Sequence, residues 1–229
     1  MTDGLPNLRF ERKFIAAEAT PAEALALVRH HPALFRTPFP PRWINNLYFD
    51  TPNLRHFHEH INGAANRVKT RIRWYGPLRG GIPRPVLERK LKRGMVSGKH
   101  TYPLAPFALN GHLPRTEIAR ALAEASLPEE LRWHLQGLQP ALVNRYHRHY
   151  FVSASGHLRL TVDTDLEFYD ARSATGILTR LRIHPPRVII ELKYPPTCIE
   201  EAAAAANALS LRMVRCSKYV LGIEHLEAA

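Results

Sequence analysis

The sequence predicts a β-rich α+β fold, in which an antiparallel sheet is flanked by helices. The clearest observation lies in residues 67–76, where Arg67, Lys69, Arg71 and Arg73 alternate with Val, Thr, Ile and Trp. A period of two is typical of a β-strand, whose successive side chains point to opposite faces. The same alternation recurs in at least five segments that are joined by turns or short helices. Such an order favours antiparallel pairing over alternating strand–helix units.

Length and composition bound the architecture. The chain has 229 residues, of which 45% are hydrophobic, and contains no apolar run of the about 20 residues that a membrane span needs. We expect a single domain over residues 1–229, with its core at about 8–223. The first residues lack the basic-then-apolar order of a signal peptide, so we expect a cytoplasmic protein. Cys198 and Cys216 are too few for a disulfide framework, and the sequence assigns them no role.

Net charge points to the chemistry of the partner. Lys and Arg number 32 against 20 Asp and Glu, which gives +12 at pH 7. A strongly basic protein attracts anions. Nucleic acid, anionic lipid, nucleotides and polyphosphate all satisfy this charge, and composition alone does not separate them.

The N-terminal half alternates strands with short helices. A strand is expected over residues 8–14, with Arg9, Glu11 and Lys13 on one face. Thr20, followed by Pro and then Glu, predicts the start of a helix that runs to about residue 31. A second strand covers residues 44–50.

The segment after this second strand is rich in histidine. A short helix at about residues 53–61 carries His56, His58 and His60. Three histidines invite a zinc interpretation, but nothing else here supplies closed ligation, so we interpret this group as a surface turn.

The middle of the chain continues the charged alternation. After the strand at 67–76, residues 85–92 predict another strand, with Glu88, Lys90 and Lys92 on one face. Glycines near residues 94 and 98 predict a flexible loop that carries Lys99. Residues 116–135 predict a helix with an apolar stripe, which is typical of core packing.

The C-terminal half contains further strands with the same alternation of charged and apolar residues. Strands are expected at 141–152 and 158–163, joined by a hairpin turn at 153–156, and again at 187–194. The last of these places Arg187, Glu191 and Lys193 on one face. An Ala-rich helix at 200–211 follows, and residues 215–219 lead into the tail.

Cations dominate one face of most of these strands. Closing the strands into a barrel removes the sheet edges, and the apolar face then points outward beneath the helices. The charged face must in that case line a lumen. Buried uncompensated charge is costly, so we expect a wet tunnel whose occupant is a polyanion with a divalent metal.

Several short motifs, in this order and spacing, resemble one known family. They are Arg9-x-Glu11-x-Lys13, Asn46-x-Tyr48-Phe49-Asp50-Thr51-Pro52, Lys69-x-Arg71-x-Arg73-x-Tyr75-Gly76, Glu88-x-Lys90, Tyr146-x-Arg148, Glu191-x-Lys193 and Ser217-Lys218-Tyr219. The chain resembles the catalytic domain of the vacuolar transporter chaperone (VTC) proteins, within the CYTH or triphosphate tunnel metalloenzyme superfamily. This resemblance implies an antiparallel eight-stranded tunnel barrel with flanking helices.

The resemblance also implies an activity. The family's eukaryotic members build polyphosphate from ATP, so the leading hypothesis is a phosphotransferase that adds the γ-phosphate of ATP to a polyphosphate chain. The alternatives are a hydrolase of inorganic triphosphate or nucleoside triphosphates, and a non-catalytic polyphosphate-binding module. CYTH relatives favour Glu-x-Glu-x-Lys in the first strand, and Arg9 in place of the first Glu favours the VTC interpretation.

Phosphoryl transfer depends on positioning and charge neutralisation, so cations are assigned most of the roles. The expected catalytic residues are Lys13, Arg71, Arg73, Lys90, Arg148 and Lys193. The expected phosphate-binding residues are Arg9, Lys69, Lys99, Tyr146, Arg159, Ser217 and Lys218. The expected ligands of Mn²⁺ or Mg²⁺ are Glu191, Glu11 and Glu88, of which the last two serve alternatively as counterions.

The expected partners follow from this chemistry. They are ATP or another triphosphate, polyphosphate and a membrane-protein partner. No nucleic acid is expected, because a narrow lumen does not admit a duplex. The oligomeric state is not predicted.

Overall fold

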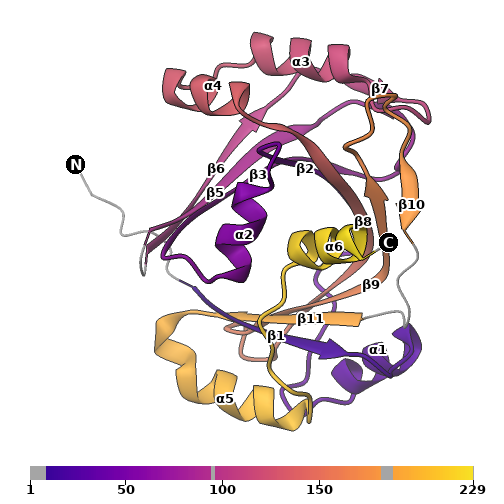
Figure 1. Ribbon diagram of the computed structural model, residues 1–229. Helices are drawn as coiled ribbons and strands as arrows, with labels where there is room; N and C mark the ends of the chain where they lie inside the picture. Colours follow the sequence, from indigo (N-terminus) through magenta and orange to yellow (C-terminus); the bar gives the residue numbers. More distant parts are fainter. Residues whose placement is uncertain (1–8, 94–95, 182–187, 229) are drawn as a thin grey trace. The chain divides into compact units, whose positions relative to one another are not determined.

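A computed structural model describes residues 9–93, 96–181 and 188–228 (Figure 1). It confirms the antiparallel, β-rich α+β class. The strands are β1 (Phe10–Ala16), β2 (Arg42–Asp50), β3 (Asn66–Tyr75), β4 (Gly80–Ile82), β5 (Val86–Arg93), β6 (Val96–Pro103), β7 (Phe107–Leu109), β8 (Gln139–Val152), β9 (Arg159–Asp170), β10 (Thr179–Leu181) and β11 (Val188–Tyr194). The helices are α1 (Pro21–Arg29), α2 (Arg55–Ile61), α3 (Arg115–Glu124), α4 (Glu129–Gln136), α5 (Ile199–Ala208) and α6 (Lys218–Glu227), with a 3-10 turn η1 at Pro196–Cys198.

The chain forms two compact units. Unit 1 comprises Met1–Trp43, Tyr146–Leu166 and Ile183–Cys216, and unit 2 comprises Ile44–Arg145, Glu167–Arg182 and Ser217–Ala229. The long strands β8 and β9 contribute residues to both units. One domain with a core at about 8–223 stays a prediction, as does closure of the strands into a tunnel.

Unit 1 is a sheet in the order β1-β11-β9-β8. One face of this sheet carries buried apolar side chains, such as Phe14, Leu160 and Ile190, which pack with Val28 of α1 and Ala202 of α5. Both helices lie on one side of β1 and β11 (Figure 1). The other face therefore carries the charged residues of these strands, as the alternation predicts.

Unit 2 is a sheet in the order β8-β2-β3-β5-β6, with β10 paired to β9 and a separate β4–β7 pair. Leu47, Ile72 and Leu87 face a core that also includes Ile118 of α3 and Leu131 of α4. The opposite face holds the cations of β3 and the carboxylate of β5. Here too the apolar face lies beneath helices.

Some expected elements differ from the structure. The single helix expected at 116–135 is two helices: α3 ends at Glu124, where the C-cap Ala125 is extended, and Pro128 stands as the N-cap of α4. The flexible loop expected to carry Lys99 is wrong, because β6 pairs with β5 from Val96 to Pro103 and Lys99 faces Lys90. Helix α6 was not predicted. Leu8 and Arg187, which the sequence assigns to strands, lie outside the described residues, as does Gly94 of the expected loop.

The histidine-rich segment forms the expected short helix α2, but the surface interpretation is wrong for His56. Its side chain is buried and stacks on His134 of α4, with ring centroids 5.4 Å apart. The helix turns this side chain inward because Phe57 and His56 share the side that packs on the unit 2 core.

Among the described residues, no helix is both long and apolar enough to cross a membrane.

Candidate functional site

The charged face of unit 2 is built by cross-strand rows on β3, β5 and β6. In one row Lys69 pairs with Lys90, and Lys90 pairs with Lys99. In the next row Tyr48 of β2 lies opposite Arg71 of β3, and Arg71 lies opposite Glu88 of β5. Side chains directly opposite in antiparallel strands are about 4.5–5.5 Å apart at Cβ, and like charges there repel. Three lysines in one row therefore favour binding of an anion.

One carboxylate forms ion pairs with several of these cations. Glu88 is buried and contacts Arg71 (Nη2–Oε2 2.6 Å, Nε–Oε2 2.8 Å), Arg73 (3.5 Å) and Lys99 (3.0 Å). Burial by itself raises the pKa of Glu88, but the positive charges of Arg71 and Arg73 outweigh it and lower the pKa to about 2. Glu88 is thus ionised at neutral pH and holds the two guanidinium groups in place.

Neighbouring polar groups fix the same arginines. Arg71 donates to the Tyr48 hydroxyl (2.9 Å), and Arg73 Nε donates to Asn46 Oδ1 (2.9 Å). Asn46 in turn donates to Asn144 Oδ1 (2.8 Å), and the Asn144 Nδ2 group is buried without a hydrogen-bond partner. Preorganised guanidinium groups lose less entropy on binding a phosphate.

Helix α6 lies against this face and is held there by Asp50. The Asp50 carboxylate is fully buried, accepts from the backbone N–H groups of His56 and Phe57 (2.9 Å each), and also accepts from the Tyr219 hydroxyl. Burial, followed by the nearby Asp50 charge, raises the pKa of Tyr219. Asp50 therefore caps α2 and anchors α6 through one carboxylate.

The anchored helix brings Ser217 to the cations. Ser217 is the N-cap of α6, where its hydroxyl accepts from Val220 N (3.4 Å) and from Lys69 Nζ (2.8 Å). Lys218, the first residue of α6, is half-buried beside it. The expected phosphate-binding group of Lys69 and Ser217 is thus brought together.

Unit 1 carries a second, more balanced charged cluster. Glu11 and Lys13 of β1 lie opposite Lys193 and Glu191 of β11, respectively. Lys13 Nζ is 2.9 Å from Glu11 Oε1 and 3.6 Å from Glu191 Oε1, and Lys193 Nζ is 4.0 Å and 3.4 Å from the same two carboxylates. Burial and the charge of Glu191 raise the pKa of Glu11, but Lys13 and Lys193 together outweigh them and leave the pKa below its ordinary value.

Arg148 is the least exposed cation of this cluster, with 12% of its side chain exposed. It forms a bidentate pair with Asp163 (2.6 and 2.7 Å) and reaches Glu191 Oε2 at 3.5 Å. Its guanidinium carbon lies 5.2 Å from the ring centre of Tyr146, which is itself buried. Burial disfavours the charged form, but Asp163, together with Tyr146 and Glu191, outweighs it and raises the pKa of Arg148 well above its ordinary value.

A family model described as the VTC domain matches residues 8–227. The chain belongs to the VTC domain family. The match spans nearly the whole chain, in agreement with the resemblance that the sequence motifs carry. A search of curated proteins found no match.

Solved structures show that this VTC domain shares its fold with other proteins. One is a proposed adenylate cyclase from Vibrio parahaemolyticus, with a TM-score of 0.51 and 13% identity, over 94% of this chain and 98% of that one. Another is a protein from Pyrococcus horikoshii OT3, with a TM-score of 0.52 and 12% identity, over 95% and 99% of the two chains. At these identities the likeness concerns the fold.

A divalent cation fits the carboxylates of unit 1 in this VTC domain. Glu11 and Glu191 already share the ammonium groups of Lys13 and Lys193. Thr161 lies opposite Glu191 on β9, and its Oγ1 is buried without a hydrogen-bond partner. Carboxylate and hydroxyl oxygens suit Mg²⁺ and Mn²⁺, which use one or two carboxylates and complete their shell with water and phosphate. Glu88 fits less well. Glu88 and Glu191 each contact three cations, but those of Glu88 come as close as 2.6 and 3.0 Å, whereas those of Glu191 lie at 3.4–3.6 Å.

Other expected site residues are exposed to solvent beside or within the two clusters. Arg159 is exposed opposite Lys193, and Lys90 is exposed at the centre of the lysine row. Arg9 is exposed immediately before β1. Their assignment to phosphate binding or catalysis stays a prediction.

Sequence reasoning missed two residues that complete the clusters. Asp163 lies in the strand expected at 158–163, where the sequence gives it no role, yet it is the main partner of Arg148. Asn46 stood only within a motif, yet it orients Arg73. For Asp163, the available signal was the alternation that places it on the same face as Thr161 and Arg159. For Asn46, no local pattern signals its role.

Proposed function

We propose that this VTC domain is a metal-dependent polyphosphate polymerase that transfers the γ-phosphate of ATP to the end of a polyphosphate chain. The observation that carries the proposal is the face of unit 2. There Lys69, Lys90 and Lys99 stand in one row and Arg71 and Arg73 in the rows beside it, with Glu88 as their carboxylate partner. Phosphate oxygens supply the negative charge that this face needs.

In this proposal the cations of unit 2 grip the phosphates. Arg71 and Arg73 offer fixed, fork-shaped donors, and the three lysines offer point charges along the chain. Ser217 offers a hydroxyl at the amino end of α6, where backbone N–H groups also favour an anion. The arginines and lysines neutralise the negative charge of the phosphates, and Ser217 donates a hydrogen bond to a phosphate oxygen. None of these groups has to change its own protonation.

The cluster of unit 1 is proposed to hold Mn²⁺ or Mg²⁺ through Glu11 and Glu191. When bound, such an ion neutralises phosphate oxygens and orients them for in-line displacement. Arg148 and Lys193 neutralise charge beside it. Asp163 keeps Arg148 in position and does not itself contact phosphate.

The lowered pKa of Glu88 makes this residue a poor general base for hydrolysis. Attack by water requires a general base, and a carboxylate with a pKa of about 2 is a poor one at neutral pH. The terminal oxygen of a polyphosphate chain is already anionic and needs no base. The lysine and arginine rows thus suit phosphate as the acceptor.

The test is an incubation of purified protein with ATP and Mn²⁺, with long phosphate chains resolved by gel and free phosphate assayed in parallel. We expect chains from the wild type and a loss of about 10²–10³ in their rate from Arg71→Ala. Arg84→Ala, which removes an exposed cation of unit 2 outside the rows, is the matched control.

Each alternative has its own outcome. Free phosphate without chains would make the protein a triphosphatase. Binding of polyphosphate that survives chelation, with neither product, would make it a polyanion-binding module. The variant Glu191→Gln separates metal binding from phosphate binding. If it loses the metal-dependent activity but still binds triphosphate, the carboxylates of unit 1 hold the metal and the cations of unit 2 bind the phosphates.

A further inference from the structure

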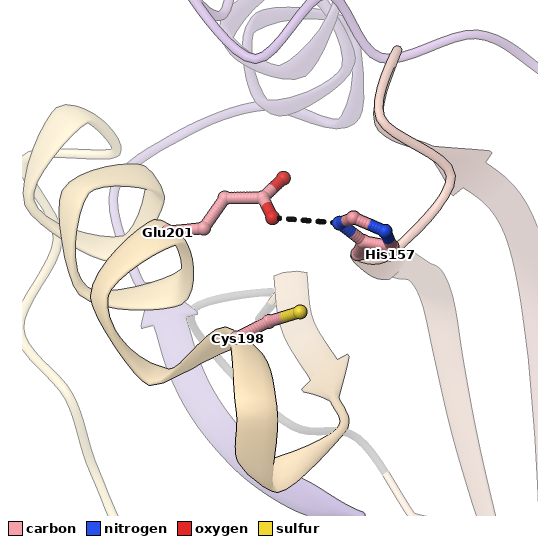
Figure 2. A group of neighbouring side chains, drawn as sticks. All are labelled: His157, Cys198 and Glu201. Atoms are coloured by element: carbon pink, nitrogen blue, oxygen red, sulfur yellow. Dashed lines mark hydrogen bonds and ion pairs between the residues drawn. The ribbon is translucent and has the colours of Figure 1, made fainter.

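A second group of metal-ligating residue types lies in unit 1, apart from the charged face. His157, Cys198 and Glu201 bring one ligand atom each to within 4.8 Å of one another (Figure 2). Across the described ranges 9–93, 96–181 and 188–228, it is the one group of three His, Cys, Asp or Glu residues that meets this criterion. It uses none of the residues assigned to phosphate or to Mn²⁺.

Two neighbouring elements supply the three side chains. His157 follows the turn between β8 and β9, two residues before Arg159, the first residue of β9. Cys198 ends the 3-10 turn η1 and is the N-cap of α5, and Glu201 lies in the first turn of that helix. Residues three apart share one face of a helix, so Cys198 and Glu201 point to the same side, toward His157 (Figure 2).

The separation of the ligand atoms suits zinc. His157 Nδ1 is 3.1 Å from Glu201 Oε2. Two ligands at about 2.0–2.1 Å from one Zn²⁺ in a tetrahedron lie about 3.3 Å apart. A thiolate, an imidazole and a carboxylate together suit Zn²⁺, a borderline-soft ion, better than Mg²⁺ or Ca²⁺, which prefer oxygen alone.

Polar contacts already orient the carboxylate. Ser155 in the same turn donates to Glu201 Oε1 (2.5 Å), while Oε2 faces His157 Nδ1. The hydrogen bond from Ser155, with a smaller contribution from His157, lowers the pKa of Glu201. A second partner on the free oxygen of a ligating carboxylate is typical of metal sites.

We propose that His157, Cys198 and Glu201 form a Zn²⁺ site, with a water molecule or an exogenous anion as the fourth ligand. The ion links the β8–β9 turn to the start of α5. The site is exposed at His157 and partly buried at Cys198 and Glu201, so an ion reaches it from solvent. Binding releases the proton of the Cys198 thiol to solvent and leaves a zinc-bound thiolate.

Cobalt provides the sharpest test, because Co²⁺ replaces Zn²⁺ and reports its ligands by absorption. We expect metal-free, reduced wild-type protein to bind one Co²⁺ with a thiolate-to-cobalt charge-transfer band, and Zn²⁺ to displace it. Cobalt held by Glu11 and Glu191 has only oxygen ligands and gives no such band. The spectrum therefore separates the two sites.

Matched variants identify the ligands. Cys198→Ser should abolish the band, and His157→Ala and Glu201→Gln should each weaken Co²⁺ binding at least tenfold. Cys216→Ser and Glu200→Gln, the other cysteine and the adjacent exposed carboxylate, should leave it unchanged. The far-UV circular dichroism of the metal-free variants should match that of the wild type.

Two results would overturn the proposal. One is the absence of a saturable thiolate band in wild-type protein, which would leave a hydrogen-bonded His157–Glu201 pair. The other is a band that survives Cys198→Ser and disappears in Cys216→Ser, which would place the metal elsewhere.

Discussion

Arg148 illustrates how a single residue joins stability to the proposed site. Its side chain is only 12% exposed, and its guanidinium group contacts Asp163 and Glu191, which are both buried. Removing one partner of a buried ion pair leaves an uncompensated charge. We expect Arg148→Met to lower the free energy of unfolding by about 3–5 kcal/mol, as measured by urea denaturation. Arg159→Met, an exposed arginine of the same unit, should change it by about 0.5 kcal/mol or less, and an equal loss in both variants would contradict this role.

Glu88 makes a pH-dependent contribution whose sign follows from its lowered pKa. The folded pKa is about 2, below the ordinary value of 4.5. The charged form is therefore favoured in the folded state, and the stabilisation is present above pH 4.5 and lost as the pH falls toward 2. We expect Glu88→Gln to be less stable than the wild type at pH 7 and to show a shallower decline between pH 4.5 and 2. Parallel curves for the two proteins in urea unfolding would refute the lowered pKa.

At the residue scale, the sequence predicted charge more reliably than pairing. Alternation alone placed Arg71 and Arg73 on one face of their strand, and Glu88 on the charged face of another, because the period of a strand fixes which of its own side chains share a face. It left Glu88 open as a metal ligand or a counterion, because that choice depends on cross-strand register. Register brings Arg71 opposite Glu88 and Lys69 opposite Lys90, and no local pattern determines it.

At the scale of elements, α6 shows what local signals omit. Its sequence contains a glycine in mid-helix, which is unfavourable for an isolated helix. The helix forms because Tyr219 reaches Asp50, far away in the chain, and because Gly222 packs closely on Leu142 and Phe168. Tertiary contacts thus override propensity here, which explains why the strand patterns were predicted and α6 was not.

The close packing of Gly222 gives an element-scale prediction. A Cβ at this position would collide with Leu142 and Phe168. Gly222→Ala should therefore destabilise the protein by about 1–3 kcal/mol, although alanine favours a helix by about 1 kcal/mol. Gly81→Ala, where a Cβ meets no atom within 4 Å, is the control and should be near neutral in thermal unfolding. A stabilised Gly222→Ala variant would show that α6 does not pack as described.

His134 of α4 gives a second pH dependence in a different range. Burial, followed by the charge of Arg89, lowers the pKa of His134 to about 4, from 6.5. The neutral form is favoured in the folded state, so stability is retained above pH 6.5 and lost as the pH falls toward 4. His134→Phe keeps the stacking on His56 without a titrating group, and it also removes a buried Nε2 that has no hydrogen-bond partner. We expect its urea midpoint to decline less than that of the wild type over this range; an identical decline would assign the loss to other groups.

At the scale of the whole molecule, net charge and its placement separate the candidate partners. The charge of +12 attracts any polyanion, including nucleic acid. The ordered rows of Lys69, Lys90 and Lys99 instead favour closely spaced phosphates over a backbone with bases. The composition thus indicates the sign of the partner's charge, and the sheet register determines the spacing of the cations that the partner's charges must match.

This distinction gives a prediction for binding without catalysis. A ligand at about 100 times its Kd stabilises the folded state by about 2.7 kcal/mol, which for a chain of this size raises Tm by about 5–10 °C. We expect inorganic triphosphate, added with a chelator, to raise the Tm of the wild type and of Arg84→Ala alike. Lys90→Ala should show a clearly smaller rise, because the centre of the lysine row is removed. If Lys90→Ala and Arg84→Ala shift equally, or if single-stranded DNA of equal charge stabilises the wild type as well as triphosphate does, the row does not recognise phosphate chains and only net charge attracts the anion.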